Sequence, residues 1–73
     1  MKRGVLVFDK ESNRYDICFG FEDYYGGLHC GESFEVFVDG KWMPTRIEMN
    51  GANNDWYLVG ISVVDLRGLG VRI

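Results

Sequence analysis

The chain has 73 residues, a formal net charge of −3 at pH 7 and a pI of about 4.9. We expect one domain over residues 1–73, which at this size buries only ~60% of the surface of its unfolded form. Since ligand pockets typically need roughly 300–1,000 Å³, room for an enclosed active site is scarce, and we expect neither enzymatic activity nor a cofactor.

Short apolar runs with a two-residue period predict strands along most of the chain. Hydrophobic residues make up 47% and aromatic residues 15%, whereas Ala52 is the single alanine, and this composition favours β-structure over helix. Residues 4–8 predict a buried strand. A polar turn at 9–13 leads to a second strand at 15–19, which we expect to pair back on the first.

The two-residue period stops between residues 20 and 33. This segment holds four of the ten glycines together with Tyr24, Tyr25, His29 and Cys30. Long irregular loops inside small domains are usually functional or disordered, and the aromatic residues argue against disorder. We therefore expect one long, ordered surface loop that contacts a partner.

A β-hairpin is predicted at residues 34–49. Asp39-Gly40 between two apolar runs is typical of a type I′ turn, which places Val38 opposite Lys41 and Phe37 opposite Trp42. The register assigns one face to the core, carrying Phe34, Val36, Val38, Met43 and Ile47. The outer face should be solvated, yet it includes two large aromatic residues and a proline. Its residues are Glu35, Phe37, Trp42, Pro44, Arg46 and Glu48.

The last third of the chain predicts a turn, a strand, a helical turn and a closing strand. Residues 56–61 are apolar on both faces, which indicates a central strand. Residues 64–68 predict one tight helical turn, and residues 69–73 alternate as a final strand. Five to six short strands with no crossover helix predict an all-β fold, a small SH3-like antiparallel β-barrel that closes its exposed edges.

The exposed aromatic residues favour a non-enzymatic interaction module that binds a protein or peptide partner. Tyrosine and tryptophan are enriched at interaction hot spots, and aromatic grooves bind extended peptides. Two alternatives stay open: the long loop covers the outer face of the hairpin, or a homodimer buries it. The predicted partner-binding residues are Tyr24, Tyr25, Phe37, Trp42 and Pro44, with His29 and Arg46 at the rim.

Two further function classes have candidate residues in the chain. An accessory nucleic-acid-binding protein would need Arg14, Arg46, Arg67 or Arg72 to converge beside the aromatic residues, although the eight basic residues form no cluster in the sequence. A metal or thiol site would use Cys18, His29 and Cys30. Their spacing is not that of structural zinc sites, so we predict no metal.

The first residues indicate a cytoplasmic protein without membrane association. Only five uncharged residues separate Arg3 from Asp9, which is too short for a signal peptide or a membrane span. In the cytoplasm, Cys18 and Cys30 are expected to stay reduced.

Three long motifs carry a resemblance to a known family. They are Tyr-Tyr-Gly-Gly-Leu-His-Cys-Gly-Glu at 24–32, Asp-Gly-Lys-Trp-Met-Pro-Thr-Arg-Ile-Glu-Met at 39–49 and Trp-Tyr-Leu-Val-Gly at 56–60. With these motifs the chain resembles an uncharacterised family of short proteins from Gram-positive gut bacteria, often encoded on mobile elements and classed as a domain of unknown function. The resemblance implies a small β domain with no established activity. A mobile-element context would favour a regulatory or nucleic-acid-associated role.

Overall fold

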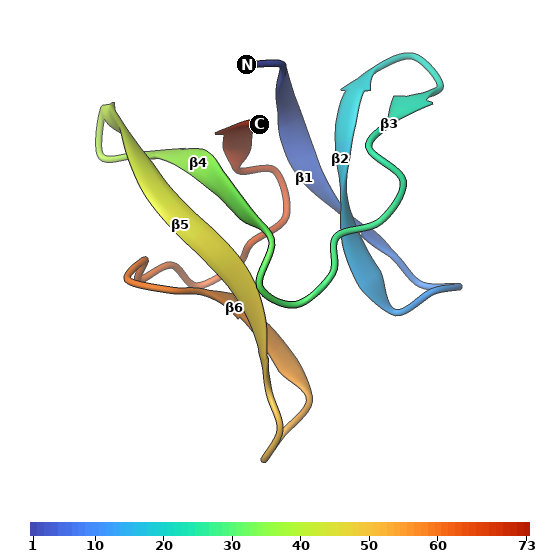
Figure 1. Cartoon of the computed structure of the whole chain (residues 1–73), viewed down its shortest axis with the longest axis vertical. Helices are drawn as coiled ribbons and strands as arrows, with labels where there is room; N and C mark the ends of the chain where they lie inside the picture. Colours follow the sequence, from blue (N-terminus) through green and yellow to red (C-terminus); the bar gives the residue numbers. More distant parts are fainter.

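Seven antiparallel strands form the fold, and the last of them lies in the middle of the sheet. The computed structural model describes residues 1–73. The sheet order is β3-β2-β1-β7-β4-β5-β6, so β7 joins a first arm (β1, β2, β3) to a second arm (β4, β5, β6) (Figure 1). The strands are β1 (Arg3–Asp9), β2 (Arg14–Gly20), β3 (Asp23–Tyr24), β4 (Ser33–Val38), β5 (Lys41–Asn50), β6 (Asp55–Leu58) and β7 (Gly70–Arg72).

The all-β prediction is confirmed, and the predicted hairpin has the expected register. β4 and β5 pair with Val38 opposite Lys41 and Phe37 opposite Trp42. Asp39 and Gly40 have φ angles of 50° and 77°, as a type I′ turn requires. The structure contains no helix of the length and hydropathy needed to cross a membrane.

Three details of the predicted architecture are wrong. The sheet is not closed into a barrel, and the SH3-like prediction is not confirmed, because the strands at its two ends, β3 and β6, do not pair with each other. β6 is an edge strand and not a central one, since the chain turns away at Gly60 (φ 77°) and returns as β7 between β1 and β4.

The third wrong detail is the helical turn predicted at 64–68, where the structure has a β-turn. The Asp65 carboxylate accepts the backbone N–H of Arg67 at 3.0 Å, a local bond that competes with helix formation. Gly68 follows with a φ of 85°, and the amide of Leu69 donates to the carbonyl of Leu66.

The segment predicted as one irregular loop, residues 20–33, contains the short strand β3, and the rest of it runs between the two arms. The amide of Leu28 donates to the carbonyl of Tyr15 on β2 at 2.8 Å. On the other side, the amide of Gly31 donates to the carbonyl of Ile47 on β5 at 2.8 Å. The loop therefore bridges β2 and β5 by backbone hydrogen bonds (Figure 1).

Two carboxylates accept hydrogen bonds from backbone amides of this loop. The Asp16 carboxylate accepts the amides of Gly26 and Gly27 at 2.9 Å each, and both glycines have left-handed φ angles. The Glu32 carboxylate accepts the amide of His29 at 2.8 Å. The loop also contributes a completely buried side chain to the core, which consists of Leu6, Ile17, Leu28, Phe34, Val36, Ile47, Leu58, Leu66 and Val71.

Candidate functional site

Phe37 and Trp42 lie side by side on the outer face of the β4–β5 hairpin. Their ring centroids are 5.2 Å apart and the rings meet edge to face at 61°. Phe37 is 44% exposed and Trp42 is half-buried. We define the hairpin surface as the outer-face residues around this pair, which are Arg3, Phe37, Trp42, Pro44, Arg46 and Arg72.

Two arginines that the β1–β7 ladder places opposite each other converge on the Trp42 ring. Arg3 pairs with Arg72 in the sheet, and like charges in such positions destabilise a strand pair. The Cζ atom of Arg72 lies 4.4 Å from the Trp42 ring centroid and that of Arg3 lies 5.6 Å away. Arg72 also forms an ion pair with Glu35. The aromatic ring and the carboxylate offset the repulsion between the guanidinium groups.

A shallow hollow opens beside the Trp42 ring. Its volume is about 310 Å³. Gly70 lines it without a side chain, and a Cβ atom there would be in ordinary van der Waals contact with the Cβ of Phe37, at 3.7 Å. No residue of the long loop lines it, so the loop does not cover this face. The lining residues are Arg3, Gly4, Phe37, Trp42, Gly70 and Val71.

The structure does not bring the loop tyrosines to the hairpin surface. Tyr24 lies on β3. Three strands (β2, β1 and β7) lie between β3 and β4, so at about 4.8 Å per strand spacing Tyr24 is roughly 20 Å from β4. Tyr25 donates its hydroxyl hydrogen bond to Glu32, and this bond raises the pKa of the Tyr25 hydroxyl. His29 is exposed on the same loop. The predicted single groove is not formed, because Leu28 anchors the loop in the core.

The arginines predicted as candidates for nucleic-acid binding are dispersed. Arg46 pairs with Glu48 at 3.0 Å, and Arg14 donates to the carbonyl of Leu28 at 3.2 Å. Arg67 pairs with Asp65 at 2.9 Å. Of the four arginines, only Arg72 lies beside Trp42, where it is joined by Arg3, a residue outside the predicted set.

The cysteines and the histidine are not grouped as metal ligands. Cys18 is half-buried on β2 and its thiol donates to the carbonyl of Gly20 at 3.2 Å. Cys30 is an exposed free thiol. No group of three or more histidine, cysteine, aspartate or glutamate side chains is arranged to hold a metal ion.

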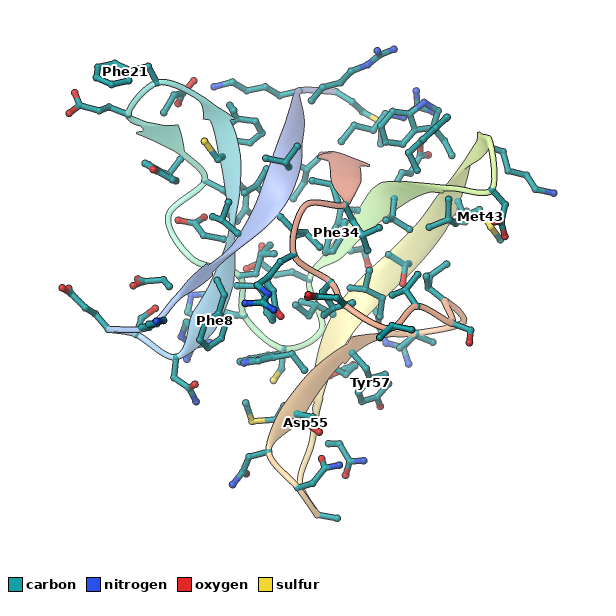
Figure 2. The ribbon with its side chains drawn as sticks, turned by 180° about the vertical axis from the view of Figure 1, so that it is seen from behind. Phe8, Phe21, Phe34, Met43, Asp55 and Tyr57 are labelled. Atoms are coloured by element: carbon teal, nitrogen blue, oxygen red, sulfur yellow. The ribbon has the colours of Figure 1, made fainter.

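A second aromatic site, which was not predicted from the sequence, lies between the ends of the two arms. We name it the end groove. It has a volume of about 540 Å³, and Phe8 lies on its first-arm side and Asp55 on its second-arm side (Figure 2). Its lining residues come from three segments that are far apart in the sequence, so no local sequence motif predicts the groove. The lining residues are Phe8, Asn13, Tyr15, Asn54, Asp55, Trp56, Val64, Asp65, Leu66 and Arg67.

Comparisons with known proteins give the chain relatives but no activity. The family model described as "Domain of unknown function (DUF5348)" matches residues 4–73. A crystal structure of a protein from Ruminococcus gnavus, a structural genomics target, is 55% identical to this chain with a TM-score of 0.89. The match covers 97% of this chain and 99% of that one. No curated protein matches the chain.

Proposed function

The chain belongs to the DUF5348 family, whose function is unknown, and we propose that it is a non-enzymatic interaction module that binds a protein or peptide partner through the hairpin surface. The observation that carries this proposal is the uncovered aromatic pair. Phe37 is 44% exposed, and no residue of the long loop lines the hollow beside it. The resemblance to an uncharacterised family is confirmed, whereas the mobile-element context stays a prediction.

The geometry of the hairpin surface suits binding because its central side chain is already held. Trp42 contacts Phe37 edge to face and Arg72 through its ring. A side chain fixed before binding loses less conformational entropy when the partner docks. Aromatic and arginine side chains are also the types that contribute most to interface energies. The exposed Pro44 extends the same face along β5.

The charge of this surface favours a partner segment that carries a carboxylate beside an apolar side chain. Arg3 makes no ion pair in the structure, whereas Arg72 is paired with Glu35. An incoming carboxylate would gain a charge-assisted bond with Arg3 while the apolar side chain fills the hollow. The proposed contact residues are Arg3, Phe37, Trp42 and Pro44, with Arg46 at the rim. Tyr24, Tyr25 and His29 lie outside this surface.

A single-stranded nucleic acid is a second candidate partner, and one observation favours it. Two guanidinium groups lie against the ring of Trp42, which packs on Phe37, and single-strand binders combine aromatic rings with basic side chains to stack bases and hold phosphates. The net charge of −3 argues against a strong interaction of this kind.

Affinity capture from a native lysate of the source organism tests the proposal, with and without nuclease. The immobilised chain is compared with two variants, Phe37→Ser on the hairpin surface and Phe21→Ser as the matched control. Phe21 is 94% exposed and points away from the ribbon at the β2–β3 turn (Figure 2). We expect a protein retained by the wild type and the control but lost by Phe37→Ser.

The nuclease arm separates the two candidate partners. Retention that vanishes with nuclease, and falls steeply with salt, supports the nucleic-acid function. Retention of nothing by the wild type, or equal retention by all three chains, contradicts the hairpin surface as a binding site.

A further inference from the structure

The end groove is a second aromatic surface with walls from both arms. Phe8 and Tyr15 pack edge to face on the first arm, with ring centroids 5.0 Å apart and an interplanar angle of 63°. Trp56 of β6 forms part of the second-arm wall, and its indole N–H donates to the carbonyl of Asn13 at 3.0 Å. This bond holds the rings of the two arms in fixed positions around a volume of about 540 Å³.

The charge of the end groove is opposite to that of the hairpin surface. Asp55, Asp65 and Arg67 are its charged lining residues, which leaves one negative charge in excess. The carboxylate of Asp65 is bonded to Arg67, whereas that of Asp55 forms no ion pair. Burial and, second, the negative charge of Asp65 raise the pKa of the neighbouring Tyr15 hydroxyl.

We propose that the end groove binds an extended peptide segment that presents an arginine or lysine next to an apolar side chain. A cationic head in this groove meets both the free carboxylate of Asp55 and the faces of aromatic rings. Its aliphatic stem, or the adjacent apolar residue, packs against the exposed Val64. A phosphate-bearing ligand would instead face two carboxylates. The proposal does not depend on the hairpin surface, which carries the opposite charge.

Panning a random peptide library on the immobilised full-length chain tests this inference. We expect enriched peptides that combine basic and apolar residues. Binding of the enriched peptides should weaken about tenfold in Asp55→Asn, which removes one interaction of about 1.4 kcal/mol. Val64→Arg, at a fully exposed position, should weaken binding by a similar factor through repulsion.

A matched control keeps the charge change but moves it away from the groove. Asp39→Asn removes one carboxylate from the β4–β5 turn, where asparagine tolerates the left-handed φ of 50°. Its peptide affinity should equal that of the wild type. Thermal melts of all variants verify that each chain is folded before its affinity is measured.

Several results would overturn the inference. One is that no enriched peptide combines basic and apolar residues, because acidic peptides are those that the hairpin surface would select. Another is that the enriched basic and apolar peptides bind Asp55→Asn and Val64→Arg as tightly as the wild type. If such peptides lose binding in Phe37→Ser, the hairpin surface selected them, and the proposed function stands while the end groove is excluded.

Discussion

The indole N–H of Trp56 donates a hydrogen bond of 3.0 Å to the backbone carbonyl of Asn13, which lies 43 positions earlier in the chain. This bond links β6 to the β1–β2 turn, whereas the long loop links β2 to β5 at another place. The two arms are thus joined by β7, by the loop and by this bond, although no strand pairing closes the sheet.

The loop should contribute to global stability through Leu28. This side chain is fully buried, so Leu28→Ala removes core contacts and leaves a cavity, and we expect a loss of about 3 kcal/mol in the free energy of unfolding. Urea denaturation measures the change. Val64→Ala, at a fully exposed position, should change it by less than about 0.5 kcal/mol. A Leu28→Ala loss as small as that of the control would show that the loop is not part of the core.

Two glycines on the first arm should respond differently to the same substitution. A Cβ atom at Gly4 would lie 2.5 Å from the carbonyl oxygen of Cys18 and 2.6 Å from Cγ2 of Ile17. Gly4→Ala should therefore destabilise the fold by about 2–3 kcal/mol through overpacking. At Gly20 no atom lies within 4 Å of the added Cβ, and Gly20→Ala should be nearly neutral. Equal melting temperatures for the two variants would refute the close packing of β1 on β2.

The Tyr25–Glu32 hydrogen bond should be visible in an alkaline titration. Because this bond raises the Tyr25 pKa above its usual 10.0, its contribution to stability is present below pH 10. That contribution is lost as the pH rises through the higher pKa of the folded state. The difference in tyrosinate absorbance between wild type and Tyr25→Phe isolates this group. Glu32→Gln should bring its pKa back toward 10.0, and an unchanged titration would contradict the bond.

The Trp42 ring should offset the repulsion between Arg3 and Arg72. Trp42→Leu keeps an apolar side chain but removes the ring, so we expect a loss of about 1–2 kcal/mol at low salt from lost area and cation–π contact. Raising the salt to about 1 M screens the charges of the exposed Arg3 and the half-buried Arg72, and it should restore part of this loss. In chains that also carry Arg3→Ala, the loss of stability caused by Trp42→Leu should no longer depend on salt, because one of the two repelling charges is absent. A loss that is independent of salt in both backgrounds would exclude the electrostatic role of the ring.

The features that the sequence predicted are those determined by local chemistry. Asp39-Gly40 sets the register of β4 against β5, so the outer-face positions of Phe37 and Trp42 followed from the turn alone. The position of β7 in the sheet could not be predicted in this way. The apolar alternation around Val71 indicates a strand, but it does not say which strands that strand pairs with. β7 lies between β1 and β4, which places β6 at an edge.

The path of the loop and the end groove could not be predicted from local sequence patterns, for a related reason. A glycine-rich loop has no apolar period, so nothing in the sequence distinguished Leu28 as a core residue. The end groove combines Tyr15, Trp56 and Asp65 from three separate segments, which only the packing of the two arms brings together. The predicted grouping of Tyr24 and Tyr25 with Trp42 required the loop to cross the outer face. It lies instead between β2 and β5.

The most direct test of the central claim is the affinity of the captured partner for three chains, measured by calorimetry. These are the wild type, Phe37→Ser on the hairpin surface and Phe21→Ser at the β2–β3 turn. If the hairpin surface binds the partner, Phe37→Ser weakens the affinity by about tenfold or more, while Phe21→Ser equals the wild type. Equal affinities for Phe37→Ser and the wild type, or a loss confined to Phe21→Ser, would contradict the proposed function.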